Sequence, residues 1–102
     1  MNVEASILHT LKEQFAPQYL EVINESHSHN VPKNSETHFK VVMATECFAG
    51  KPLVYRHRAV YDALAGAMEN GVHALALHTY TPEEWAKRSV APSSPNCLGG
   101  ER

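Results

Sequence analysis

The sequence lacks the marks of several common protein classes. It has only two cysteines, Cys47 and Cys97, and neither has a cysteine or histidine partner at zinc-site spacing, so neither a disulfide framework nor a conventional zinc site is indicated. No apolar stretch approaches the length of a transmembrane helix, and no basic leader precedes an apolar run. We therefore expect a cytoplasmic protein without a membrane partner. No internal repeat is visible.

An excess of positive charge is lacking too. Nine Lys and Arg against eleven Asp and Glu give a formal net charge of −2, which lowers the expectation of purely electrostatic DNA binding. We expect no enzyme, because no nucleophile lies beside a base at an informative spacing. Histidine, in contrast, is abundant, with seven in 102 residues. The histidines and one local basic segment are therefore the candidates for function.

The hydrophobic pattern predicts one α/β (α+β) domain with the element order α-β-β-α-β-α and a three-stranded mixed sheet with helices on one face. The predicted elements are a helix over 3–15, strands over 19–25 and 37–45, a helix that closes at Asn70-Gly71, a strand over 73–80 and a helix over 82–88. Residues 89–102 are rich in Ser, Pro and Gly, which predicts a flexible tail after a domain of residues 1–88.

The junction between the last strand and the last helix is strongly specified. Thr81 is placed as N-cap, Pro82 as the first helical residue and Glu84 as the reciprocal partner of a capping box. Tyr80 and Trp85 occupy the two positions of a hydrophobic staple. The sequence therefore predicts a well-fixed strand–helix corner.

The topology makes a geometric prediction about the histidines. The first two strands are most simply an antiparallel pair joined by the loop 27–35, and the second and third form a right-handed parallel crossover. Parallel neighbours begin at the same edge of a sheet. His29 in the loop and His73 at the start of the third strand are therefore expected at one edge, and the segment 50–58 at the opposite edge.

The chain resembles the BolA family in four segments that occur in the family's order. They are 28–32 (SHNVP) with 35–41 (SETHFKV), 48–50 (FAG), 56–58 (RHR) with Val60, Tyr61 and Leu64, and 72–85 (VHALALHTYTPEEW). The similarity spans about residues 3–88. It implies a class II KH-like fold. It also implies pairing with a monothiol glutaredoxin around a [2Fe-2S] cluster, and, for bacterial members, DNA-binding transcriptional regulation that affects cell shape and stress responses.

For the shared cluster, the resemblance implies His73 as one ligand and His29 as the second, with a glutaredoxin cysteine and a glutathione thiolate supplying the others. His27 and His38 remain alternatives to His29. The alternative for His73 is a polar strand-edge residue with a satisfied hydrogen bond. Two histidines are a poor cluster site by themselves, so no cofactor is expected for the isolated chain, which we expect to be a monomer or weak dimer.

For DNA, the candidates are Lys51, Arg56, His57 and Arg58, at the start of the predicted second helix. No acidic residue lies between Lys51 and Asp62, and cations near free helix amides suit phosphate contact. The G-x-x-G loop by which KH-like folds grip nucleic acid is absent, since only Gly50 stands there. The alternative is a solvated helix start whose arginines pair with nearby acids and whose His57 faces inward.

Overall fold

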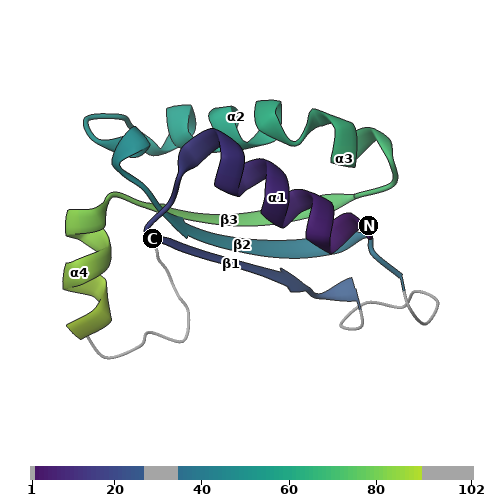
Figure 1. The fold of residues 1–102 in the computed structure, drawn as a ribbon, viewed down its shortest axis with the longest axis horizontal. Helices are drawn as coiled ribbons and strands as arrows, with labels where there is room; N and C mark the ends of the chain where they lie inside the picture. Colours follow the sequence, from purple (N-terminus) through teal and green to yellow (C-terminus); the bar gives the residue numbers. More distant parts are fainter. Residues whose placement is uncertain (1, 27–34, 91–102) are drawn as a thin grey trace.

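The computed structural model describes residues 2–26 and 35–90 (Figure 1). Its elements are α1 (Val3–Phe15), β1 (Tyr19–Asn24), β2 (His38–Ala44), the 3-10 turn η2 (Glu46–Phe48), α2 (Leu53–Ala63), α3 (Ala65–Glu69), β3 (Ala74–Tyr80) and α4 (Pro82–Val90). The predicted order of helices and strands is confirmed. Helix α4 reaches Val90, two residues beyond the predicted helix end, and the rest of the predicted tail, residues 91–102, lies outside the described residues.

The predicted second helix differs in one respect, because it is broken into α2 and α3 at Leu64. There the backbone leaves helical geometry (φ −102°, ψ 19°), and the Leu64 N–H is shared between the carbonyls of Val60 and Tyr61. The Leu64 side chain is buried at this point. The Leu64 side chain therefore stays in the core at the point where α2 ends and α3 begins.

The sheet has the order β1-β2-β3, with β1 and β2 antiparallel and β2 and β3 parallel. His38 is in register with Ala74 and Ala44 with Tyr80, so β2 and β3 begin at the same edge, and the predicted mixed sheet is confirmed. Helices α1, α2 and α3 lie over one face of the sheet, whereas α4 stands at its end (Figure 1). No helix in the described part of the chain is both long and apolar enough to cross a membrane.

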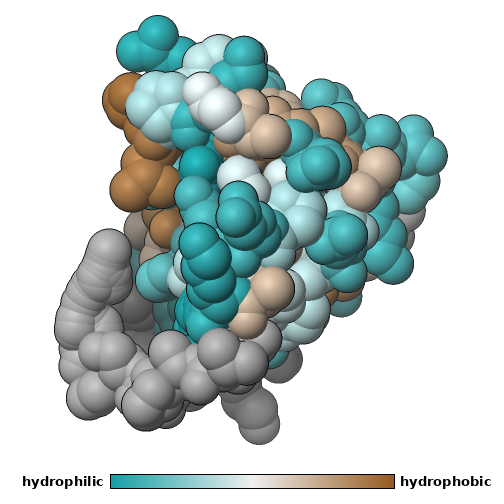
Figure 2. Space-filling model, turned by 90° about the vertical axis from the view of Figure 1, so that its left-hand side faces the viewer, coloured by the Kyte–Doolittle hydropathy of each residue, from teal (hydrophilic) through white to brown (hydrophobic). Residues whose placement is uncertain are grey.

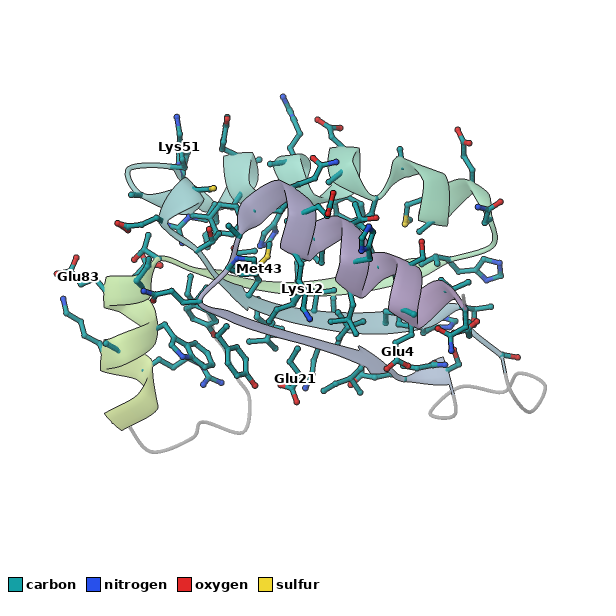
Figure 3. All side chains as sticks on the ribbon, in the orientation of Figure 1. Glu4, Lys12, Glu21, Met43, Lys51 and Glu83 are labelled. Carbon is teal, nitrogen blue, oxygen red and sulfur yellow. The ribbon has the colours of Figure 1, made fainter. Side chains whose placement is uncertain are left out.

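The core lies between the sheet and helices α1 to α3. Met43 of β2 points toward the helices, and Glu21 of β1 points to the opposite side (Figure 3). This alternation is what the two-residue period of a strand predicts. The buried hydrophobic cluster consists of Ile7, Leu11, Phe15, Val22, Phe39, Val41, Met43, Phe48, Val60, Leu64, Val72 and Leu75.

Side chains of α2 also bind the backbone of β3, which is an edge strand of the sheet. The Tyr61 hydroxyl donates to the Leu75 carbonyl at 3.1 Å, and the Arg56 guanidinium donates to the Thr79 carbonyl at 3.2 Å. These two bonds fix the helix along the strand at two points four residues apart.

The predicted corner before α4 is confirmed. The Thr81 N–H donates to Glu84 Oε1 at 3.0 Å, and the Glu84 N–H donates to Thr81 Oγ1 at 3.1 Å, which is a complete capping box. The Tyr80 and Trp85 ring centroids are 5.3 Å apart. Trp85 also stacks on Tyr19 at 4.5 Å, so α4 is attached to both outer strands of the sheet.

Candidate functional site

Two histidines meet where β2 and β3 begin, and we call this pair, His38 and His73, the histidine edge. The His73 N–H donates to the Thr37 carbonyl at 2.7 Å, which fixes the backbone of His73 beside β2. The His73 side chain is exposed, and its ring meets that of His38 edge to face, with centroids 6.1 Å apart. The topology therefore brings His73 together with His38, one of the two alternatives to His29 as second ligand. His29 and the other alternative, His27, lie outside the described residues.

The two ends of the segment 27–34 are fixed beside the histidine edge. Two hydrogen bonds join the residues before the segment to those after it. The Asn24 side-chain amide donates to the Ser35 carbonyl at 2.9 Å, and the buried Ser26 hydroxyl accepts the Thr37 N–H at 2.9 Å. The loop that carries His29 in the sequence therefore leaves and rejoins the domain at the edge where His73 lies.

The histidine edge does not by itself form a complete metal site within the described residues. Among residues 2–26 and 35–90, no group of three or more His, Cys, Asp or Glu side chains could hold a metal ion. The imidazole of His73 is exposed at the fixed start of β3, and histidine is a known replacement for thiolate in [2Fe-2S] ligation.

The segment 50–58 lies at the opposite end of the sheet, as the topology predicts (Figure 3). Lys51 and Arg58 are exposed there. The Lys51 ammonium lies 4.8 Å from the centre of the Tyr55 ring, a cation–π contact that leaves the charge at the surface. Lys51 lies in the turn before α2 and Arg58 in the middle of that helix, so the two exposed cations lie seven residues apart in the sequence.

Arg56, predicted as a DNA contact, occupies a different environment. Only 6% of the residue is exposed, and its Nε donates to the Lys51 carbonyl at 2.8 Å. Its two terminal nitrogens donate to the Glu84 carboxylate at 2.7 and 3.1 Å, and one also reaches the Thr79 carbonyl. The alternative interpretation, an arginine paired with an acid, describes this geometry, so we take Arg56 out of the proposed DNA surface.

His57 is half-buried, and its environment opposes a positive charge. Burial lowers its pKa below the ordinary value, and the neighbouring Arg56 guanidinium lowers it further. A neutral imidazole near neutral pH is a poor partner for a phosphate. The exposed charge of the predicted DNA segment therefore comes from Lys51 and Arg58.

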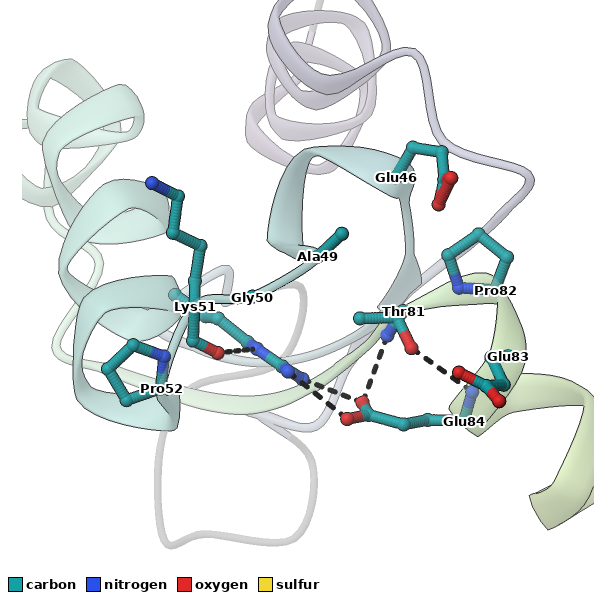
Figure 4. Close-up of a pocket in the computed structure, with 10 residues that line it drawn as sticks. Glu46, Ala49, Gly50, Lys51, Pro52, Thr81, Pro82, Glu83 and Glu84 are labelled. Atoms are coloured by element: carbon teal, nitrogen blue, oxygen red, sulfur yellow. Dashed lines mark hydrogen bonds and ion pairs between the residues drawn. The ribbon is translucent and has the colours of Figure 1, made fainter.

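Sequence reasoning missed the groove in which the Arg56–Glu84 pair lies. This groove of about 900 Å³ runs between the turn before α2 and the start of α4 (Figure 4), and its lining includes Glu46, Lys51 and Glu83. The two paired residues are 28 positions apart in the sequence. No local pattern signals such a pair, because its formation depends on how the crossover places α2 against α4.

An exposed apolar patch at the first turn of α2 was missed as well. Leu53 is 53% exposed, Val54 68% and Tyr55 49%. Hydrophobic side chains are visible on this side of the molecule in Figure 2. The signal was present in the sequence, because three consecutive large apolar residues in a helix cannot all face one core.

Comparisons with known proteins agree with this architecture. A family model described as BolA-like protein matches residues 11–84. A Vibrio cholerae protein named DNA-binding transcriptional regulator BolA is 53% identical over 93 residues, which are 90% of this chain and 88% of the relative. The Escherichia coli protein of the same name is 45% identical over 100 residues, covering 97% and 95% of the two chains.

A solved structure gives the same result. The solution structure of BolA1 from Mus musculus superposes with a TM-score of 0.80 and 41% sequence identity, covering 97% of this chain and 80% of that one. Fold, sequence and family model thus coincide over most of the chain. The chain belongs to the BolA family.

Proposed function

We propose that this protein is a BolA-like adaptor that pairs with a monothiol glutaredoxin and contributes ligands to a bridging [2Fe-2S] cluster. The observation that carries the proposal is the position of His73. Its imidazole is exposed, while its backbone is held by the bond to the Thr37 carbonyl. A donor that is accessible and also fixed is what a site shared between two proteins requires.

The remaining ligands come from outside the described residues. His29 is the proposed second ligand, from the loop whose ends are fixed beside the histidine edge. The glutaredoxin cysteine and a glutathione thiolate supply the other two, and the cluster, when bound, supplies iron–sulfur chemistry for trafficking or sensing. The contribution of this chain is to hold neutral imidazole lone pairs toward the partner.

Co-expression with the cell's monothiol glutaredoxin tests this proposal. Anaerobic purification is expected to give a coloured complex, and His73→Ala is expected to abolish or shift its visible absorption and circular dichroism. His9→Ala is the matched control, since His9 lies exposed on α1 away from the histidine edge. Identical spectra for wild type and His73→Ala would rule out His73 as a ligand.

A second candidate function is DNA-binding transcriptional regulation. Two observations favour it: the Vibrio cholerae and Escherichia coli relatives are named for it, and Lys51 and Arg58 are exposed. Helix α2 has no acidic residue in its first turn and no side-chain cap, so its first N–H groups suit an anion. This surface lies at the far end of the sheet from the histidine edge, so one protein has room for both activities.

A further inference from the structure

We propose that Ser26 and Thr37 hold the His38 imidazole in the neutral tautomer that carries its proton on Nε2. In this tautomer His38 is a positioning residue beside His73 and not a cluster ligand. The tautomer follows from hydrogen bonds within this chain alone. The assignment of His38 as a positioning residue rests in addition on the proposed cluster function.

The argument begins at the Ser26 hydroxyl. Ser26 is 2% exposed, and its oxygen accepts the N–H groups of Thr37 at 2.9 Å and of His38 at 3.1 Å. A hydroxyl oxygen has two lone pairs, and both are used here. The Ser26 proton must therefore be donated, and Thr37 Oγ1 lies 3.4 Å away as an acceptor.

The Thr37 hydroxyl then has one acceptor within the described residues. Its oxygen lies 2.8 Å from His38 Nδ1, and its other side-chain neighbour is Ser26, whose lone pairs are occupied. Donation from Thr37 to Nδ1 satisfies every hydroxyl proton in the group. Donation in the other direction would leave the Thr37 proton without an acceptor among these residues. Nδ1 is therefore the acceptor, which places the proton of the neutral ring on Nε2.

This tautomer decides what His38 offers to a metal. A metal-bound imidazole coordinates through a nitrogen lone pair, and its other nitrogen usually donates a hydrogen bond. In His38 the Nδ1 lone pair is engaged by Thr37, and Nε2 carries the proton. The ring instead packs edge to face against His73 at 6.1 Å. Thr37 thereby serves both histidines, because its carbonyl accepts the His73 N–H at 2.7 Å.

Nitrogen-15 NMR of the isolated protein tests the tautomer directly. Long-range proton–nitrogen spectra at about pH 8, above the usual histidine range, distinguish the protonated from the unprotonated ring nitrogen. We expect His38 to show an unprotonated Nδ1 and a protonated Nε2. A protonated Nδ1, or a rapidly exchanging mixture of tautomers in the wild type, would overturn the proposal.

A matched pair of variants tests the cause. Thr37→Val keeps the shape and the backbone bonds but removes the hydroxyl, so the His38 signals should move toward a mixture of tautomers. Thr79→Val is the control, since Thr79 Oγ1 is buried without a hydrogen-bond partner in the described structure. If the Thr37→Val spectrum kept the wild-type tautomer, the hydroxyl relay would not be what fixes the ring.

Experiments on the glutaredoxin complex test the positioning role of His38 separately from its tautomer. His38→Ala is expected to keep the visible absorption and shift the circular dichroism, because a neighbour of the ligand is lost. Complete loss of the colour in this variant would make His38 a ligand and contradict its positioning role. If the wild type itself gave no coloured complex, the proposed function would fail, while the NMR result would still decide the tautomer.

Discussion

Arg56 and Glu84 join α2 to α4 through two parallel hydrogen bonds, from Nη1 to Oε1 at 2.7 Å and from Nη2 to Oε2 at 3.1 Å. The guanidinium is almost fully buried, whereas the carboxylate is about half exposed. The same carboxylate accepts the Thr81 N–H, so one side chain closes the capping box and neutralises the buried cation. Glu84 therefore links the start of α4 to α2, in addition to the ring contacts that Trp85 makes with the sheet.

Glu84→Gln is expected to lower the free energy of unfolding by about 2 kcal/mol. The amide removes the charge opposite a buried guanidinium and places an N–H donor against one of its nitrogens. Urea denaturation followed by circular dichroism measures this loss. Glu83→Gln is the control: Glu83 pairs with Lys87 at the exposed surface, and its loss should cost less than about 0.5 kcal/mol. Equal effects of the two changes would contradict the importance of the ion pair.

The contribution of Glu84 should also disappear in acid. The hydrogen bond from Arg56 lowers the pKa of Glu84 below its ordinary 4.5, with burial opposing this and the Thr81 bond adding to it. The stabilisation is therefore fully present above about pH 4.5 and is lost as the pH falls through the lower folded-state pKa. The stability difference between wild type and Glu84→Gln, followed by urea denaturation across this range, should shrink as the carboxylate is protonated. A difference that stayed constant would refute the ionic origin.

The lowered pKa values of His57 and His78 predict a second pH range, above that of Glu84, in which the free energy of unfolding depends on pH. Burial lowers the pKa of both His57 and His78, and the cations Arg56 and Lys40 respectively lower it further. The unfolded chain then binds more protons than the folded one, so stability is present above about pH 6.5 and falls as the pH drops through the folded-state values. Thermal unfolding measured across this window should show the decline. His57→Gln should reduce the decline, and an unchanged decline in that variant would contradict this origin.

A matched pair of threonines predicts opposite changes in stability. Thr79 Oγ1 is buried without a hydrogen-bond partner within the described residues, so Thr79→Val should stabilise the fold by about 1 kcal/mol. Thr45 is equally buried, but its hydroxyl donates to the Phe15 carbonyl at 2.7 Å, so Thr45→Val should destabilise by about 1 to 3 kcal/mol. Differential scanning calorimetry measures both. A destabilised Thr79→Val would show that the hydroxyl has a partner after all.

The DNA proposal predicts a charge-specific loss. Replacing Lys51 and Arg58 with Ala should weaken DNA binding and lower the slope of log affinity against log salt by about 2. Titration by fluorescence anisotropy at several salt concentrations measures both quantities. The double change Lys12→Ala and Lys87→Ala removes the same charge elsewhere on the surface and should leave the slope unaltered. If both double changes weakened binding equally, the surface with Lys51 and Arg58 would not be the DNA contact.

Much of the fold could be predicted from the sequence because its signals are local. Pro17 after α1, the alternation in β2, and the Thr81–Glu84 capping box each act over a few residues. The parallel crossover then placed His73 and the basic segment at opposite ends. The break at Leu64 was not predictable in this way, because helical spacing continues through it and only the core decides where the axis bends.

The chemistry of the candidate sites was less predictable, since it depends on contacts between distant segments. Arg56 and Arg58 look alike in the sequence, yet one is buried against Glu84 and the other is exposed. The hydroxyls of Ser26 and Thr37 carried no signal either, because polar residues near a loop are ordinary. Their importance follows only from the antiparallel pairing that brings the two ends of the loop together.

The contacts of α2 along β3 have a consequence for self-association. β3 is an edge strand with the sequence ALALHTY, which contains no proline and no Lys, Arg, Asp or Glu. Edge strands of this kind can pair with strands from other chains. Tyr61 and Arg56 already occupy the carbonyls of Leu75 and Thr79. An incoming strand would have to displace both side chains before it could pair. Side chains of α2 thus protect this uncharged edge strand, although β3 itself contains no Lys, Arg, Asp or Glu.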